Sequence, residues 1–100
     1  MIHGLKIWPE YFNEIVAGNK NFEVRQADRP FREGDHLALN EWDPETEEYT
    51  GASVLVKVTY LWKDPKYVRE GYVIMSIAPC SVFPYYQSHA PHSTRWEGAV

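Results

Sequence analysis

The sequence holds a single cysteine, Cys80, among its 100 residues. It therefore has no disulfide framework and no pair of cysteines at a zinc-site spacing, and a reducing, cytoplasmic setting is the simplest expectation. No stretch approaches the roughly 18 apolar residues of a membrane span, and the first residues lack the pattern of a signal peptide. His89 and His92, even with Cys80, do not form a recognised ligand set. We therefore expect no metal, no cofactor and no membrane partner.

Positive charge is also scarce, because 10 Lys and Arg stand against 14 Asp and Glu, for a formal net charge of −4. Such a chain does not coat nucleic acid indiscriminately, since contacts to phosphates need surplus cations. The acidity is concentrated in residues 34–56, which hold six carboxylates and no Lys or Arg. The remaining residues sum to +2. Any nucleic-acid site must therefore be a small, selective pocket built from a local group of cations.

The acidic segment 41–48 includes the turn signal Asp43-Pro44, which predicts an exposed loop between strands. Two interpretations of this loop remain open. It is a solvated segment that keeps the protein soluble, or it is a docking surface in which Glu45, Glu47 and Glu48 face a basic partner protein.

The apolar residues suffice for one compact core, because Val, Leu, Ile and Phe number 23 and aromatic residues make up 15% of the chain. One hundred residues form a single domain and leave no room for a second, cofactor-binding half. The composition therefore predicts one small globular domain, which we expect to be a monomer.

One short helix is predicted over residues 9–17. Pro9 suits the first helical position, and Phe12, Ile15 and Val16 recur at helical spacing. Gly18 is placed for a left-handed cap at the carboxyl end.

Five strands are predicted from alternation and β-branched residues. They are expected at 3–7, 21–25, from Leu37 onward, at 53–61 and at 71–78, where Pro79 ends the last one. This order favours a mostly antiparallel sheet curled into a small barrel that the helix covers on one side. We expect a barrel domain over residues 1–78 and an irregular extension over 79–100, partly packed on the barrel.

The run Gly18-x-Lys20-x-x-Glu23-x-Arg25, on a turn from helix to strand, resembles the signature of ASCH domains, which are small relatives of the PUA RNA-binding fold. The resemblance is to a short bacterial and phage-associated branch of unknown function and covers about residues 3–78. It rests on an ordered set of further pieces: His3-x-Leu5-Lys6, Pro9-x-Tyr11-Phe12, Asp28-Arg29-x-Phe31, Gly34-Asp35, Glu41-Trp42, Tyr49-Thr50-Gly51, Val58-Thr59-Tyr60 and Gly71-Tyr72-Val73. It implies a mainly β, PUA-like barrel of five or six strands with one or two short helices. It also implies that RNA or a nucleotide-like molecule is the ligand.

Three residues of the run are the first candidates for a binding site. Glu23 and Arg25 lie two apart on one strand face, opposite Phe22 and Val24, so they are close enough to pair. If Lys20 reaches the same cleft, two cations can bind a phosphate while Glu23 accepts a hydrogen bond from a base amine. The alternative is an internal ion pair that only locks the strand.

Four further residues complete the predicted binding set. Arg29 extends the basic side of the cleft or pairs with Asp28 to support a loop. Lys6, beside an aromatic residue, is one part of a base-stacking site or a side chain that snorkels over the core. Trp42 and Tyr60, near strand ends, stack a base or belong to the core.

An enzyme is the second hypothesis. Some small ASCH proteins resemble amidohydrolases that act on acylated cytidine through a Lys, a Thr nucleophile and a Glu. Lys20 matches that lysine, but Glu23 stands where the threonine would be, and a carboxylate cannot replace an activated alcohol. A hydrolase acting on a modified nucleoside or RNA would therefore use Lys20 and Glu23 as an acid–base pair. The third hypothesis is a phage-type interaction module that engages a host protein through segment 41–48.

Overall fold

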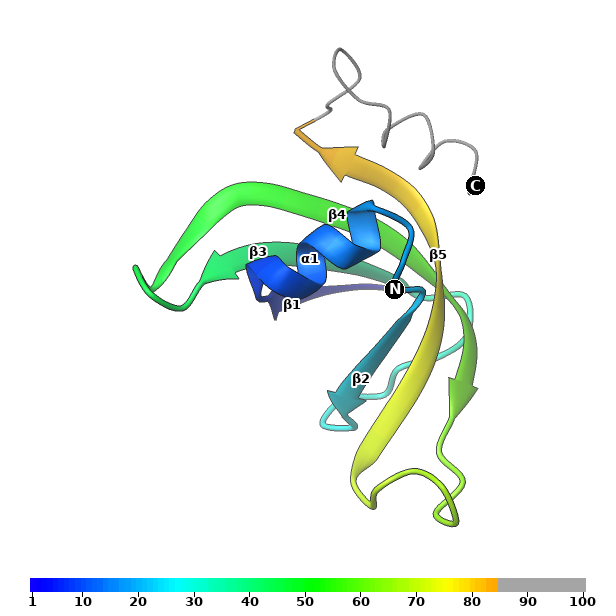
Figure 1. Cartoon of the computed structure of the whole chain (residues 1–100). Helices are drawn as coiled ribbons and strands as arrows, with labels where there is room; N and C mark the ends of the chain where they lie inside the picture. The colour runs from blue at the N-terminus through cyan, green and yellow to red at the C-terminus, as the bar shows by residue number, and fades with distance from the viewer. Residues whose placement is uncertain (85–100) are drawn as a thin grey trace.

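The protein is a curved, mainly β structure with one short helix (Figure 1). The computed structural model describes residues 1–84, and the part of the predicted extension beyond them, with His89 and His92, lies outside the described residues. The elements in chain order are β1 (Ile2–Ile7), α1 (Pro9–Val16), β2 (Phe22–Gln26), β3 (His36–Asp43), β4 (Glu48–Trp62) and β5 (Tyr72–Phe83). No helix in this part of the chain is long and apolar enough to cross a membrane. The prediction of a mainly β fold with a short helix and five strands is confirmed.

The five strands form one sheet in the order β1-β3-β4-β5-β2. Only β1 and β3 run parallel, and the other three pairs are antiparallel. The sheet curves into a half-barrel whose two edges, β1 and β2, are not paired with each other. Helix α1 connects these two edge strands in the chain. It therefore lies beside the open seam of the half-barrel, the gap between β1 and β2.

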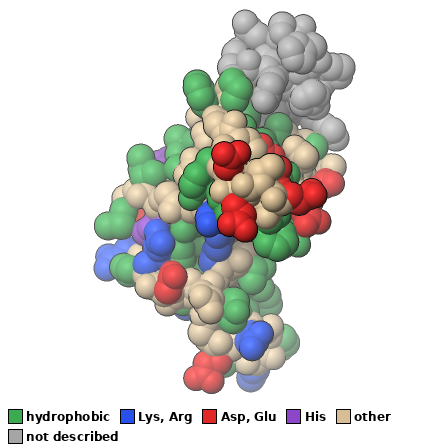
Figure 2. All heavy atoms as spheres, turned by 90° about the vertical axis from the view of Figure 1, so that its left-hand side faces the viewer, with side chains coloured by type: hydrophobic (Ala, Val, Ile, Leu, Met, Phe, Trp, Pro, Cys, Tyr) green, Lys and Arg blue, Asp and Glu red, His purple; other side chains and the backbone are tan. Residues whose placement is uncertain are grey.

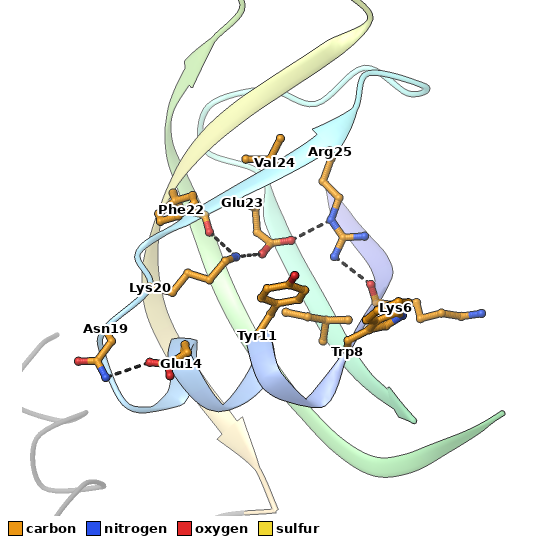
Figure 3. Close-up of a pocket in the computed structure, with 11 residues that line it drawn as sticks. Lys6, Trp8, Tyr11, Glu14, Asn19, Lys20, Phe22, Glu23, Val24 and Arg25 are labelled. Atoms are coloured by element: carbon orange, nitrogen blue, oxygen red, sulfur yellow. Dashed lines mark hydrogen bonds and ion pairs between the residues drawn. The ribbon is translucent and has the colours of Figure 1, made fainter. Parts of the chain in front are cut away.

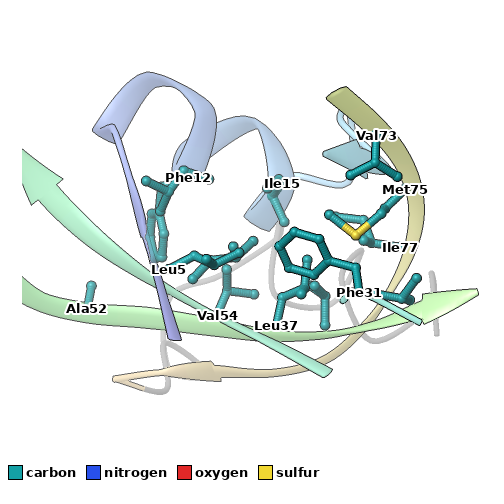
Figure 4. Close-up of a cluster of buried hydrophobic side chains, with 14 residues drawn as sticks. Leu5, Phe12, Ile15, Phe31, Leu37, Ala52, Val54, Val73, Met75 and Ile77 are labelled. Carbon is teal, nitrogen blue, oxygen red and sulfur yellow. The ribbon is translucent and has the colours of Figure 1, made fainter. Parts of the chain in front are cut away.

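Helix α1 covers the concave side of the sheet (Figure 4). Pro9 is its first residue, Glu10 lies in its first turn, and Gly18 follows it with a φ of 82°. That φ is in the left-handed region, which a glycine adopts at no steric cost. Phe12 and Ile15 are buried and point into the core, as their spacing predicted.

The inward side chains of the central strands form the core beneath the helix. Leu37, Leu39, Val54 and Val58 have no solvent exposure, and Met75 is also fully buried. Burying a side chain of this size stabilises a fold by about 1.5–3 kcal/mol. These residues hold β3, β4 and β5 rigid, and the two edge strands are carried on that support.

Two predicted boundaries were wrong. Pro79 does not end the last strand, because β5 continues to Phe83 and crosses residue 78. Val56 pairs with Pro79 and Leu55 with Ser81, so Cys80 is an extra, bulged residue, and a bulge is where a strand tolerates proline. The acidic segment is also not one loop, since β3 ends at Asp43 and β4 begins at Glu48 rather than Ser53.

Strand β2 has the opposite orientation to the one its hydrophobicity favours. Glu23 is buried, at 3% exposure, and Arg25 is half-buried. Phe22 and Val24 are 46% and 50% exposed. The apolar pair therefore faces solvent, while the polar pair faces the concave side of the half-barrel.

Candidate functional site

A pocket of about 830 Å³ opens at the seam between β1 and β2, beside α1 (Figure 3). This volume is within the range of small-molecule sites, about 300–1,000 Å³. The end of β1, the outer side of α1, two residues of the turn (Asn19 and Lys20) and most of β2 contribute its walls. The predicted residues Lys6, Lys20, Glu23 and Arg25 all line it.

The carboxylate of Glu23 lies between two cations. Lys20 Nζ donates to Glu23 Oε1 and also to the main-chain oxygen of Phe22, the latter at 2.8 Å. Arg25 Nε donates to Glu23 Oε2 at 2.8 Å. A buried ionised carboxylate is tolerated only when it is paired and hydrogen-bonded in this way.

Arg25 also joins the two edges of the sheet, because its Nη2 donates to the main-chain oxygen of Lys6 at 2.9 Å. These two bonds use two of the five N–H donors of the guanidinium, and Lys20 uses two of its three. The remaining donors are available to an acceptor in the pocket. The side chains of Arg25 and Lys20 are 24% and 16% exposed, so the pair is shielded but still in contact with solvent.

Three aromatic residues surround this polar centre, and each is about half exposed. Trp8 is 47% exposed, Tyr11 is 46% and Phe22 is 46%, and all three line the pocket. Lys20 Nζ lies 4.9 Å from the ring centroid of Phe22 and 5.7 Å from that of Tyr11. The pocket therefore combines flat apolar walls with a charged, hydrogen-bonding centre.

A smaller pocket of about 400 Å³ lies on the other side of Arg25. Arg29 lines this second pocket together with Arg25, Lys6 and Asp28. Arg29 Nε is 3.6 Å from Asp28 Oδ1, and both side chains are solvent-accessible. The structure thus brings Arg29 close to Arg25 but not into the larger pocket.

The other predicted residues lie elsewhere. The Lys6 side chain points away from the pocket (Figure 3), and its Nζ lies 3.9 Å above the ring centroid of Trp42. Trp42 is near the end of β3, on the hairpin with the acidic residues. Tyr60 is 56% exposed on β4, two strands away from β2. Roles for Trp42 and Tyr60 in binding stay predictions.

The hydrolase hypothesis requires a nucleophile or an activated water at the pocket. Among the described residues that line the pocket, none is Ser, Thr or Cys. Thr50 donates to Glu41 and Thr59 to the main-chain oxygen of Ser76, both away from the pocket. Within residues 1–84, no three His, Cys, Asp or Glu side chains are grouped to hold a metal ion.

The predicted set lacked the aromatic walls. Tyr11 lies outside the apolar stripe of the helix formed by Phe12 and Ile15, so its exposure could have been predicted from the sequence. Phe22 gave no such signal, because the alternation of its strand favours burial of Phe22 and Val24 rather than exposure. Only the three-dimensional pairing of Glu23 with Lys20 and Arg25 decides which face is inside.

Comparison with known proteins gives a family and one curated relative. Residues 2–77 match the family described as "Domain of unknown function (DUF3850)". The chain is 36% identical over 58 residues to the "Uncharacterized 12.9 kDa protein in GpA 3'region" of Escherichia phage P2. That match covers 58% of this chain and 51% of the relative, so the chain spans about half the length of the phage protein.

Proposed function

Because the chain belongs to the DUF3850 family, a domain of unknown function, we propose from its site that it is an RNA- or nucleotide-binding module. The ligand lies in the seam pocket between β1, α1 and β2. The observation that carries the proposal is the clamped carboxylate of Glu23, held by Lys20 and Arg25 at the centre of an open, aromatic-walled pocket.

The chemistry of a nucleotide fits each part of this pocket. A base is flat and stacks on aromatic side chains, and each such stack contributes about 1–3 kcal/mol. Trp8, Tyr11 and Phe22 supply these walls. A carboxylate accepts hydrogen bonds from the exocyclic amine of a base, and Glu23 is fixed in place to do so.

The charge of the pocket fits a phosphate of the ligand. Its lining holds the cations Lys20 and Arg25 against the carboxylates of Glu14 and Glu23, while the ammonium of Lys6 points away from the pocket toward Trp42. Glu14 accepts a hydrogen bond from Asn19 at 3.0 Å, at the far end of α1. The free N–H donors of the planar Arg25 guanidinium can bind two oxygens of a phosphate at once. Because two cations stand against two carboxylates, we expect modest, salt-sensitive binding rather than a broad electrostatic grip.

The resemblance to ASCH domains supports the same proposal, because the charged residues of its signature run line the pocket. Lys20, Glu23 and Arg25 belong to the quoted run, and Gly18 ends the helix that leads into it. The half-barrel with one covering helix agrees in outline with the small barrel expected for that superfamily.

Isothermal titration calorimetry with the four nucleoside monophosphates and a pool of short RNAs tests the proposal. We expect at least one ligand to bind, and to bind more weakly as the salt concentration rises. Arg25→Ala and Lys20→Gln should each lower the affinity by about tenfold, which corresponds to loss of one charged hydrogen bond. Lys57→Ala, which removes an exposed cation on β4 outside the pocket, is the matched control and should bind as the wild type does.

The wild-type protein itself can refute the proposal. If the folded protein shows no salt-sensitive binding to any of these ligands, the pocket is not a nucleotide site. Circular dichroism of each variant separates loss of binding from loss of folding. Mass spectrometry of the recovered ligands reports any hydrolysis, and a product that disappears in Lys20→Gln would replace the binding module with an enzyme.

A further inference from the structure

The outer, convex face of the sheet carries two rows of side chains that begin at the pocket and extend beyond it. Residues paired directly across antiparallel strands project on the same face of a sheet. The register aligns two rows across β2, β5 and β4, which are Phe22–Ser76–Tyr60 and Val24–Ile74–Trp62. The alternate positions Glu23 and Met75 are buried on the other face.

This face is unusually apolar for a solvent-exposed surface. Phe22 is 46% exposed, Val24 50%, Tyr60 56% and Trp62 40%. Contiguous exposed apolar surface of this kind marks an interaction site. We call the outer face of β2, β5 and β4 around these residues the aromatic platform.

The loop between β4 and β5 enlarges the aromatic platform. Tyr67, 71% exposed, stacks on Trp62 with ring centroids 5.6 Å apart and an interplanar angle of 27°. Arg69 lies 5.3 Å above the ring of Tyr72, the first residue of β5. Tyr72 itself pairs with Gln26 of β2 and thus continues the rows. The β4–β5 loop therefore contacts the sheet through two aromatic residues, Trp62 and Tyr72.

Charge distinguishes this end of the molecule from the acidic hairpin. Residues 62–72 contain three cations and two carboxylates, and Lys20 at the other end of the platform lies 4.9 Å from the Phe22 ring. The acidic residues of segment 41–48 are on the separate β3–β4 hairpin. Figure 2 views the molecule from the side of that hairpin. Acidic side chains gather in the middle of this view, and Lys and Arg side chains lie below and beside them. This distribution of charge favours binding of a polyanion at the aromatic platform rather than at the acidic hairpin.

We propose that the aromatic platform binds single-stranded nucleic acid. Unpaired bases stack on Tyr60, Trp62 and Tyr67, and Lys63, Lys66 and Arg69 contact the phosphates beside them. Aromatic side chains interleaved with cations are the combination that binds single strands without base-specific contacts. A duplex does not fit this surface, because its bases are already stacked on each other and cannot reach an aromatic ring.

The platform is continuous with the pocket but does not depend on it. Phe22 and Val24 line the pocket as well as the platform, so a strand with one nucleotide in the pocket continues across β5 and β4. The stacking on Tyr60 and Trp62 holds whether or not the pocket takes a ligand. It also gives Tyr60 a role in binding, although Tyr60 does not line the pocket.

Fluorescence anisotropy with labelled 12-nucleotide single strands of RNA and DNA tests this binding. Trp62→Ala and Tyr60→Ala should each weaken binding by about tenfold, the effect of losing one stacked base. Phe83→Ala is the matched control, because Phe83 is another exposed aromatic residue at 66% exposure, at the far end of β5. It should bind as the wild type does. A shared loss for RNA and DNA indicates stacking alone, and a larger loss for RNA indicates a contact to the 2′-hydroxyl.

Salt titration tests the cations separately. The double variant Lys63→Gln/Lys66→Gln should lower the affinity for all sequences and reduce the slope of log K against log salt by about 1.4, for two phosphates of a single strand. The proposal is overturned if Trp62→Ala binds the 12-mers as tightly as the wild type, or if a duplex binds better than either strand. It is also overturned if sedimentation shows a wild-type dimer that Trp62→Ala makes monomeric, since the platform would then join two copies of the chain.

The two sites fail independently in these measurements. Trp62→Ala should leave binding of nucleoside monophosphates unchanged, because Trp62 is not in the pocket. If Arg25→Ala binds 12-mers normally while no monophosphate binds the wild type, the platform stands and the pocket proposal fails. If Trp62→Ala binds everything normally while Arg25→Ala does not, only the pocket stands.

Discussion

Arg25 ties Lys6 of one edge strand to the other edge of the half-barrel. Its Nη2 lies 2.9 Å from the main-chain oxygen of Lys6, while its Nε lies 2.8 Å from Oε2 of Glu23. One guanidinium thus sets the separation of β1 and β2 and also orients the carboxylate at the centre of the pocket. The geometry of the pocket depends on the planar fork of an arginine and not on its charge alone.

Replacement of Arg25 by lysine therefore tests the fork. Arg25→Lys keeps the positive charge but cannot reach Glu23 and the Lys6 oxygen together with the same geometry. We expect the free energy of unfolding, measured by urea denaturation, to fall by about 1 kcal/mol, the typical worth of one hydrogen bond. Arg32→Lys is the control, because Arg32 contacts Asp35 through its main-chain N–H. Equal stability of Arg25→Lys and the wild type would show that the seam does not rely on this bridge.

Much of the fold could be predicted because its signals are local. Pro9, the Phe12–Ile15 spacing and Gly18 define the helix within a few residues of chain, and alternation defines β1. The limits of β4 and β5 were missed because they depend on pairing between distant residues. Pro79 is tolerated because β5 bulges at Cys80, with Val56 of β4 opposite Pro79 and Leu55 opposite Ser81, and no local pattern shows that.

The site was predictable in its charges and not in its walls. Lys20, Glu23 and Arg25 stand close together in the sequence at strand spacing, so their proximity could be predicted. The bridge from Arg25 to the main-chain oxygen of Lys6 and the place of Phe22 in the pocket wall could not be predicted. They arise because β1 and β2, separated by the helix in the chain, become the two edges of one sheet.

The orientation of β2 predicts unequal effects of the same substitution at Val24 of β2 and at Val73 of the neighbouring strand β5. Val24→Thr places a hydroxyl on the exposed face and should change the free energy of unfolding by less than about 0.5 kcal/mol. Val73→Thr, at a fully buried position of the paired strand β5, should lower it by about 1–3 kcal/mol because the hydroxyl is buried without its water. Urea denaturation of the two variants measures this difference. A larger loss for Val24→Thr would place the apolar face of β2 inside.

Glu23→Gln tests the clamped carboxylate. The amide keeps the shape of the side chain, but its NH₂ group faces a cation instead of accepting from it. We expect the free energy of unfolding to fall by about 1–3 kcal/mol, as for a buried group that loses a charged partner. Glu45→Gln, at an exposed carboxylate of the acidic hairpin, should have almost no effect.

A double-mutant cycle assigns that loss to the ion pair. In the Lys20→Met background the cost of Glu23→Gln should be smaller, by a coupling energy of about 0.5–3 kcal/mol. Additive effects of the two substitutions would mean that Lys20 and Glu23 do not interact in the folded protein, and the clamp would then rest on Arg25 alone.

Asp35 predicts how the fold responds to acid. His3 Nε2 lies 2.7 Å from Asp35 Oδ2 in a buried contact, and the main-chain N–H of Arg32 donates to the same oxygen at 3.0 Å. The hydrogen bond with His3 is the main cause that lowers the pKa of Asp35 below its ordinary value of 3.8, burial opposes it, and the Arg32 N–H adds to the lowering. A carboxyl whose pKa is lower in the folded state binds its proton more readily when unfolded.

The stabilisation from Asp35 is therefore fully present above about pH 3.8 and is lost as the pH falls through the lower pKa of the folded state. Urea midpoints measured from pH 6 to pH 2 should show Asp35→Asn less stable than the wild type at pH 6. The two curves should converge as the pH falls below the lowered pKa of the folded state, because the wild-type carboxyl is then protonated and as neutral as the amide. Asp28→Asn, at a side chain that is 62% exposed, should follow the wild-type curve throughout. Curves for Asp35→Asn and the wild type that stay parallel down to pH 2 would show that the carboxyl keeps its ordinary pKa, and that its contact with His3 stabilises the fold independently of ionisation.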